Sequence, residues 1–156
     1  MDSLRVSKKL NIGCGTDYKS DWVNIDVSPE VKADHYLDIQ KDQLPATDAS
    51  IDEIYCSGVL EQILFNNDFV HYMNEAWRVL NNNGVMTVIV PSAKYSIAYR
   101  DPFDCRRFTE DTFKYIQYNE RHYHKYGKVY GFKPWLILTC ITNEQGIMTL
   151  TMQKYV

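Results

Sequence analysis

Two glycines follow a short apolar run near the start of the chain, and an acid ends the next such run. Lys9–Ile12 leads into Gly13-Cys14-Gly15, and Trp22–Ile25 leads into Asp26. Glycine at the carboxyl end of a parallel strand tolerates positive φ and lets the backbone approach a ligand closely. A carboxylate at the end of the neighbouring strand can accept two hydrogen bonds from a ribose diol. The pattern therefore predicts a nucleotide-type site, the alternative being a plain strand-turn-strand.

The spacing of this motif excludes a nicotinamide dinucleotide. That fingerprint is G-x-G-x-x-G with an acid roughly 20 residues further on. Here Tyr18 stands in place of the third glycine, and Asp26 follows Gly13 by only thirteen residues. The third glycine serves close packing of a helix on the strand, and there is hardly room for a helix between Gly15 and Val23.

A second group of chemically capable side chains lies in the irregular segment 92–107. An aspartate there can take a proton from a hydroxyl group, and arginines can hold an anionic acceptor. The alternative is a salt-bridged surface loop. His122 and His124 lack the spacing and partners of a metal site, so we expect no metal. The candidate catalytic residues are Asp101 and Asp104, and the candidate acceptor-binding residues are Tyr99, Arg100, Arg106 and Arg107.

Size and composition indicate one domain over residues 1–156. The chain has 156 residues, 45% of them hydrophobic, and a formal net charge of −3, which argues against a protein that wraps nucleic acid. We expect no signal peptide and no membrane span. The four cysteines form no C-x-x-C pair, so we expect reduced thiols and a cytoplasmic location.

The elements that must position these residues follow from periodicity and turn chemistry. One helix is predicted from Asn66 or Asn67 to about Asn81, with Val70, Met73, Trp77 and Leu80 on its apolar face and the left-handed cap at 81–84. A second is predicted over 109–118, with Phe108 and Phe113 as a hydrophobic staple. The predicted strands are 9–12, 22–26, 35–38, 52–57, 85–90, 135–142 and 147–155.

These elements predict an α/β fold with a single doubly wound sheet of about seven strands, mostly parallel with a C-terminal antiparallel hairpin. Helices in the N-terminal half are reduced or missing, and both confident helices cover the same face. The opposite face of the sheet, here called the thin face, therefore lacks a helix of its own. Because a parallel sheet is normally buried on both sides, we expect the thin face to be covered by another subunit or by segments 92–107 and 119–133.

Several segments together resemble class I S-adenosylmethionine-dependent methyltransferases, especially the short methyltransferase-11-like subgroup with its Rossmann-like sheet. The segment 10–15 resembles the first motif of that family, and 44–63 resembles its "LP…SFDxI…VLEHI" run. The segment 75–84 is similar to "E-x-x-R-V-L-K-P-G-G", and 101–109 is similar to a "DPxHxRxFT" element.

The resemblance implies roles for individual residues. Asp26 would hold the ribose, and Asp38 with Ile39 would read the adenine. The remaining cofactor residues would be Asn11, Gly13, Cys14 and Gly15 near the methionine part, and Cys56, Ser57 and Gly58 beside the sulfonium. Glu61 is interpreted as an ordinary acid at the start of a helix.

The sequence also departs from the family pattern on the side of the chemistry. Gly58 and Gln62 replace histidines of the "SHVLEH" consensus, and Asp104 replaces the histidine of the "DPxH" element. Asn11 stands where many members carry an acid.

The resemblance implies methyl transfer from S-adenosylmethionine, giving S-adenosylhomocysteine, to an oxygen or nitrogen of a small molecule or glycan. The alternative is a non-catalytic subunit or scaffold that supports a partner chain, and both the lost histidines and the thin face favour it. Aminopropyl transfer ranks last, because an acidic pocket for polyamines is not evident. A nucleic-acid methyltransferase would carry a D/N-P-P-Y/F/W motif, which 90–93 lacks. We expect a homodimer or a partner subunit, and no membrane contact.

Overall fold

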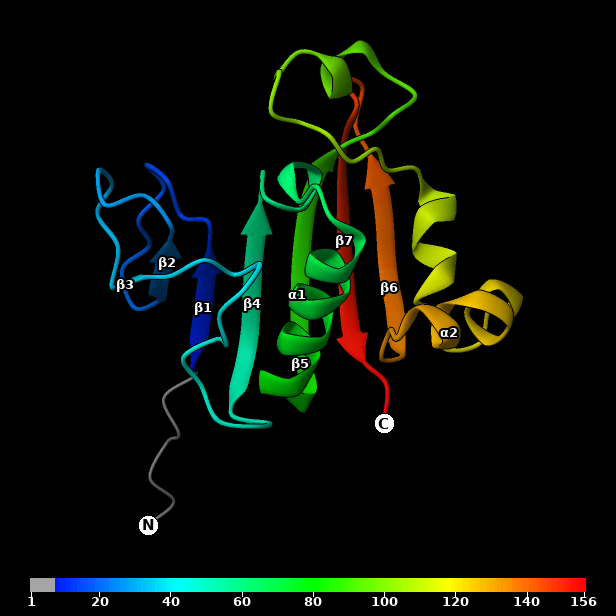
Figure 1. Ribbon diagram of the computed structural model, residues 1–156, viewed down its shortest axis with the longest axis horizontal. Coiled ribbons are helices and arrows are strands. Elements are labelled where there is room, and N and C mark those ends of the chain that lie inside the picture. The colour runs from blue at the N-terminus through cyan, green and yellow to red at the C-terminus, as the bar shows by residue number, and fades with distance from the viewer. Residues whose placement is uncertain (1–7) are drawn as a thin grey trace.

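The computed structural model describes residues 8–156 and contains a seven-stranded sheet in the order β3-β2-β1-β4-β5-β7-β6 (Figure 1). Only β7 runs antiparallel to its neighbours. The α/β class, the strand number and the terminal hairpin are therefore as predicted. The strands are β1 (Lys9–Ile12), β2 (Val23–Asp26), β3 (His35–Tyr36), β4 (Ile51–Ser57), β5 (Leu80–Pro91), β6 (Trp135–Thr142) and β7 (Ile147–Lys154).

The helix α1 (Asn66–Val79) packs on one face of the sheet (Figure 1). The apolar residues that it buries are Phe69, Tyr72, Met73, Ala76 and Val79, so the buried face is rotated relative to the one predicted from sequence. Val70 and Trp77 are only half-buried. Trp77 remains partly accessible because its indole N–H reaches sideways to the Pro134 carbonyl, 2.8 Å away.

The end of α1 differs from the predicted left-handed cap. The chain passes directly from Val79 into β5 at Leu80, and Gly84 lies buried inside that strand. The last carbonyls of the helix do not need a glycine cap, because those of Arg78 and Val79 accept the N–H groups of Ala49 and Ser50 from the loop before β4.

The second predicted helix is a 3₁₀ helix, η3 (Glu110–Tyr115), preceded by Thr109. The stacked rings of Phe108 and Phe113, 5.6 Å apart, form the predicted staple. The helix ends early because the chain turns to meet β6: the N–H of Tyr118 donates to the carbonyl of Trp135. Segment 119–133 then forms the π turn η4 (Tyr123–Gly127) and α2 (Lys128–Tyr130), which we had not predicted.

The two irregular segments lie in different places: segment 119–133 is on the α1 side, and segment 92–107 is at the carboxyl edge of the sheet. Segment 119–133 contacts α1 through the Asn74 amide, which donates to the Gly131 carbonyl. Segment 92–107 arches above the carboxyl end of β5 (Figure 1), and the N–H groups of Cys105 and Arg106 donate to the Glu61 carbonyl in the turn after β4. Neither crosses the second face. Of the two covers expected from the sequence, these segments are therefore the wrong one, and another subunit stays a prediction.

The two faces of the sheet are buried to different degrees. In β5, Met86 and Val88 on the α1 side are buried, whereas Val85 and Thr87, which alternate with them along the strand, are only half-buried. The same alternation runs along β7. The 17–22 loop covers part of this second face, because Trp22 packs edge-on against the ring of Tyr55 in β4. No other segment within residues 8–156 covers it.

No helix in the described part of the chain is long and apolar enough to span a membrane.

Candidate functional site

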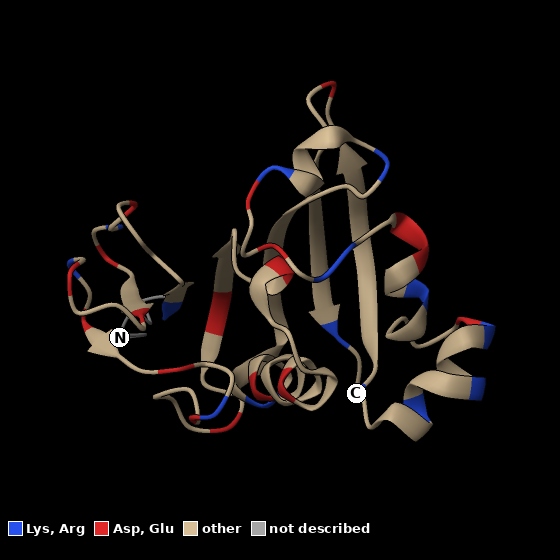
Figure 2. Cartoon of the chain, turned by 45° about the horizontal axis from the view of Figure 1, so that its top comes forward, with Lys and Arg blue, Asp and Glu red and all other residues tan. Residues whose placement is uncertain are grey.

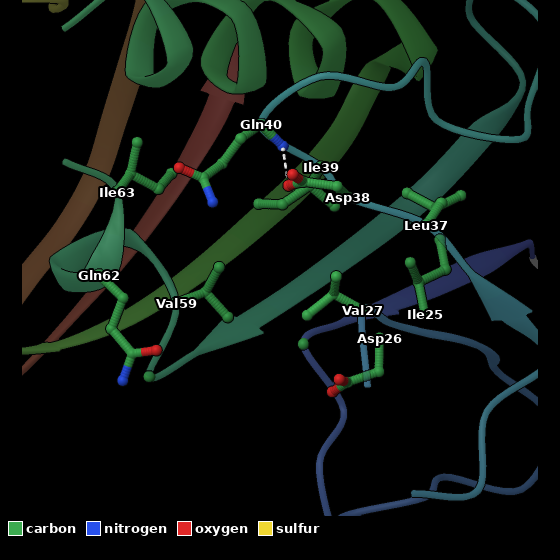
Figure 3. A pocket seen from close by; sticks show the side chains of 12 residues that line it. Ile25, Asp26, Val27, Leu37, Asp38, Ile39, Gln40, Val59, Gln62 and Ile63 are labelled. Carbon is green, nitrogen blue, oxygen red and sulfur yellow. Dashed lines mark hydrogen bonds between the residues drawn. The ribbon is translucent and has the colours of Figure 1, made fainter. Parts of the chain in front are cut away.

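The carboxyl ends of β1, β2 and β4 surround a cavity of about 190 Å³ (Figure 3). Open α/β sheets bind ligands at this edge. The cavity contains five of the predicted cofactor residues, namely Gly13, Asp26, Asp38, Ile39 and Gly58. The other lining residues are Ile25, Val27, Leu37, Gln40, Val59, Gln62 and Ile63, which the sequence did not single out as cofactor contacts.

The glycine turn after β1 is closed by an apolar side chain. Gly13 has φ of 61°, and a Cβ at this position would overlap the Cγ2 methyl group of Val59. Ligand pockets usually measure roughly 300–1,000 Å³, so this cavity is narrow, and Val59 is the apolar side chain that narrows it at the glycine turn. Val59 lies on the 58–63 turn between β4 and α1, where no long element holds it.

Asp26 ends β2 with both carboxylate oxygens directed at backbone N–H groups. Its Oδ2 accepts the N–H of Gly15 at 2.8 Å, and its Oδ1 accepts the N–H of Ser28 at 2.9 Å. Each oxygen keeps a second lone pair for a hydroxyl donor. The carboxylate is therefore fixed in orientation and still able to accept two hydrogen bonds from a diol.

Asp38 lies across the cavity from Asp26 in a tight turn after β3 (Figure 3). Its Oδ1 accepts the N–H of Gln40 at 2.9 Å, and its own N–H donates to Asp42. The segment is joined to β2 through the N–H of Leu37, which donates to the carbonyl of Asp26. The two acids thus lie at fixed positions around one cavity and can bind separate parts of a nucleoside.

Three of the other predicted cofactor residues do not line the cavity but hold the strands and turns next to it. The Asn11 amide is buried and donates to the carbonyl of Asp17 and to Oδ1 of Asn24, so it fastens β1 to β2. The Cys14 side chain is buried, and its N–H donates to the carbonyl of Ile25. Gly15 acts through its N–H, which orients the Asp26 carboxylate.

The remaining two predicted cofactor residues lie at the end of β4. Cys56 is fully buried, and this burial raises the pKa of its thiol to about 12, so it is a neutral packing group. Ser57 is half-buried but does not line the cavity. The cavity wall at this point is made by Gly58, the next residue along the chain.

The predicted acceptor residues divide into engaged and exposed side chains. Arg106 donates to the Ile63 carbonyl at 3.0 Å and lies 4.5 Å from the Phe69 ring, so it holds the 63–66 segment. The Arg107 guanidinium donates to the Asp104 carbonyl and stacks on the Tyr99 ring at 4.6 Å. Exposed positions are occupied by Tyr99, Arg100 and Asp101.

Glu61 is buried, unlike the ordinary acid at the start of a helix that the sequence predicts. It lies on the 3₁₀ turn η1 (Leu60–Gln62) after β4, only 5% exposed, and its Oε2 has no hydrogen-bond partner. Burial, followed by repulsion from Asp104 and Asp101, raises the pKa of this carboxyl to about 7. The sequence signal was its place in the "VLEQI" run, directly between the cavity-lining residues and the loop after β5.

The residues described here contain no group of three His, Cys, Asp or Glu side chains that could hold a metal ion.

Comparison with known proteins agrees with this geometry. A family model described as "Methyltransferase domain" matches residues 10–88, which is 79 of 156 residues. No curated protein matches the sequence.

Solved structures share the fold over nearly the whole chain. An S-adenosylmethionine-dependent methyltransferase from Clostridium acetobutylicum is 14% identical with a TM-score of 0.66, and the match covers 98% of this chain and 86% of that one. A putative methyltransferase of Haloferax volcanii, in complex with the Trm112 methyltransferase activator, is 13% identical with a TM-score of 0.65, covering 100% and 86%. An S-adenosylmethionine-dependent methyltransferase from Archaeoglobus fulgidus is 13% identical with a TM-score of 0.65, covering 95% and 86%.

The residues of the cavity fit the cofactor of such enzymes, since two oriented acids and a glycine turn meet at the carboxyl edge of the sheet. The chain belongs to the methyltransferase domain family, and its cofactor is S-adenosylmethionine.

Proposed function

We propose that this protein transfers a methyl group to an oxygen or nitrogen atom of a small molecule or glycan. The observation that carries the proposal is the single cavity that brings Asp26 and Asp38 together beside the glycine turn. When bound, the cofactor supplies an electrophilic methyl group. Asp26 would accept the ribose hydroxyls and Asp38 the adenine amino group, because each carboxylate is oriented by backbone N–H groups and keeps free lone pairs.

The acceptor would enter between segment 92–107 and the 58–63 turn. Within residues 8–156 the sheet carries no separate substrate domain, and a small or protruding acceptor fits this arrangement best. Alignment and exclusion of water supply much of the rate of such a displacement. The loop is well placed for this, because the N–H groups of Cys105 and Arg106 donate to the carbonyl of Glu61 and close it over the turn.

The first test is calorimetric titration with S-adenosylmethionine and S-adenosylhomocysteine, with NAD as control. We expect micromolar binding of the first two and none of NAD. Asp26→Ala removes a charged acceptor and should weaken binding about 10- to 100-fold, equivalent to about 1.5–3 kcal/mol. Glu30→Ala is a matched control: this acid is exposed in the same region and does not line the cavity. A folded protein that binds neither compound would refute the proposal.

A second candidate function is that of a non-catalytic or partner-dependent subunit. The half-open second face of the sheet favours it, with the exposed edge residues Leu138 and Ile141. A neighbour in fold, the Haloferax volcanii protein, is bound to a methyltransferase activator. We propose that a second copy or a partner chain covers this face. Light scattering tests this: a monomer that transfers methyl groups unaided would refute it.

We also propose that the protein works in the cytoplasm, because all four of its cysteines are free thiols.

A further inference from the structure

Three acids meet where the loop after β5 closes over the end of β4. Glu61 is on η1, and Asp101 and Asp104 are on the loop, which carries both acidic and basic residues (Figure 2). The N–H groups of Cys105 and Arg106 donate to the Glu61 carbonyl, and the Gln62 amide donates to Oδ1 of Asp104 at 3.5 Å, so the loop is fastened to η1 beside these acids. Charge repulsion from both aspartates contributes to the raised pKa of the Glu61 carboxyl. Within residues 8–156, none of the three forms an ion pair with a lysine, arginine or histidine. Mutual repulsion without a counter-cation is unfavourable for the protein alone.

The nearest arginines do not neutralise this cluster. Arg106 is directed at the carbonyls of Ile63 and Leu64, and Arg107 donates to the backbone carbonyl of Asp104 rather than to its carboxylate. The loop geometry therefore uses the two cations for main-chain contacts. Asp104 accepts a hydrogen bond from the neutral Gln62 amide and Asp101 from the N–H of Phe103, so neither carboxylate is neutralised by these contacts.

The Glu61 carboxyl also lies next to the cofactor cavity. Its Oε1 is 3.8 Å from the position that a Cβ on Gly58 would take, and Gly58 lines the cavity. Its Oε2 is buried without a partner, and a buried carboxylate in that state costs free energy unless something completes it. A ligand that reaches this point from the acceptor side would meet an unpaired carboxylate oxygen.

We infer that Glu61, Asp101 and Asp104 form an anionic subsite for the ammonium group of an amine acceptor, so that the atom methylated is nitrogen. This inference rests on the proposed methyl transfer. Asp101 and Asp104, at the more open end, attract the cation, and Glu61, at the buried end, holds the nitrogen beside the cofactor cavity. The carboxylates offer no donor for an anionic acceptor and would repel one.

The same arrangement accounts for activation of the nitrogen. An ammonium group must release one proton before its nitrogen has a lone pair. That proton passes to the Glu61 carboxylate, so that an ammonium ion and a carboxylate become a neutral amine and a neutral carboxylic acid. A carboxyl with a pKa of about 7 can hold this proton near neutral pH. Cys56, the other titratable group facing Glu61, stays neutral because burial raises its pKa to about 12.

The test compares two ligands that differ at the reacting position. S-adenosylhomocysteine lacks the methyl group, whereas sinefungin carries an amine on a carbon that replaces the sulfonium with its methyl group. Both are titrated into the full chain by calorimetry, for the parent, Glu61→Gln, Asp104→Asn and the control Glu120→Gln, whose half-exposed side chain lies in segment 119–133.

We expect sinefungin to bind the parent at least about tenfold more tightly than S-adenosylhomocysteine, as a charge-assisted hydrogen bond allows. Glu61→Gln should abolish the preference while leaving S-adenosylhomocysteine affinity within about twofold, Asp104→Asn should reduce it, and Glu120→Gln should not change it. If Glu61→Gln fails to fold, the test rests on Asp104→Asn, which lies on the loop: a reduced preference for sinefungin supports the subsite, and an unchanged preference overturns it. Equal affinities in the parent would overturn the subsite and leave the methyltransferase proposal standing. Binding of neither ligand would overturn both.

Discussion

The contact between the glycine turn and Val59 allows a sharp test of how the cofactor cavity is closed. Gly13 and Gly15 both have positive φ, 61° and 48°. Alanine at either position must adopt a left-handed backbone, at a cost of about 1–2 kcal/mol. The two sites differ in space: a Cβ on Gly13 would overlap Val59 Cγ2, whereas a Cβ on Gly15 meets no atom within 4 Å.

This difference gives the expected magnitudes. Gly15→Ala should lower the free energy of unfolding by the backbone cost alone, about 1–2 kcal/mol. Gly13→Ala adds the cost of forcing a methyl group into occupied space, typically about 1–3 kcal/mol, for a total of about 2–5 kcal/mol. Adding Val59→Ala to Gly13→Ala removes the overlap and should recover that second part.

The assay is urea unfolding of the parent, the three single variants, and the two double variants Gly13→Ala/Val59→Ala and Gly15→Ala/Val59→Ala. We expect a coupling energy of about 1–3 kcal/mol between positions 13 and 59, and none between positions 15 and 59. Equal destabilisation by Gly13→Ala and Gly15→Ala, with no recovery in the double variant, would refute the claim that Val59 closes the turn.

Three further predictions concern buried charges. Arg78 pairs with Glu75 through 2.7 and 2.8 Å hydrogen bonds and also holds the carbonyls before β4, so Arg78→Met should cost on the order of 3 kcal/mol in urea unfolding. Burial acts to raise the pKa of Glu75, but hydrogen bonds from Arg78 and the Leu44 N–H outweigh it and leave that pKa lowered. The stability from Glu75 is therefore present above its unfolded pKa of about 4.5 and lost as pH falls through the folded value; Glu75→Gln should reduce this acid dependence. The pKa of Glu61 is raised, so the native state binds the extra proton and the free energy of unfolding falls as pH rises from about 4.5 to about 7. Glu61→Gln should remove this slope and stabilise the protein at pH 8 by roughly 3 kcal/mol. An unchanged pH profile would contradict the buried, unpaired state of that carboxyl.

The sheet was predictable from sequence because its signals are local. The boundaries of β1 and β6 match the predicted runs, and β2, β4 and β7 differ by one residue at one end. Alternation and β-branched runs depend only on neighbours along the strand. The end of α1 was not predictable, because its final carbonyls are capped by Ala49 and Ser50, thirty residues earlier in the chain.

Site residues were likewise predictable where the signal is local and not where it depends on distant contacts. Gly13, Asp26 and Asp38 could be found because each follows a strand whose carboxyl end faces the cavity. The burial of Glu61 could not be read from the sequence, since it depends on the loop after β5 folding back onto η1. Arg106 was expected to meet an acceptor, yet in the structure it binds main-chain carbonyls of the 63–64 segment, a contact with no sequence pattern of its own.

The 58–63 turn links the two halves of the site. Val59, Gln62 and Ile63 line the cofactor cavity, while the carbonyl of Glu61, between them, accepts the N–H groups of Cys105 and Arg106 and so holds segment 92–107. A shift of the turn backbone at Val59 would displace Glu61 and the loop attached to it. Entry of the cofactor should therefore alter the acceptor side even where the two ligands do not touch. That coupling supplies a physical reason for the two to bind in order, with the cofactor first.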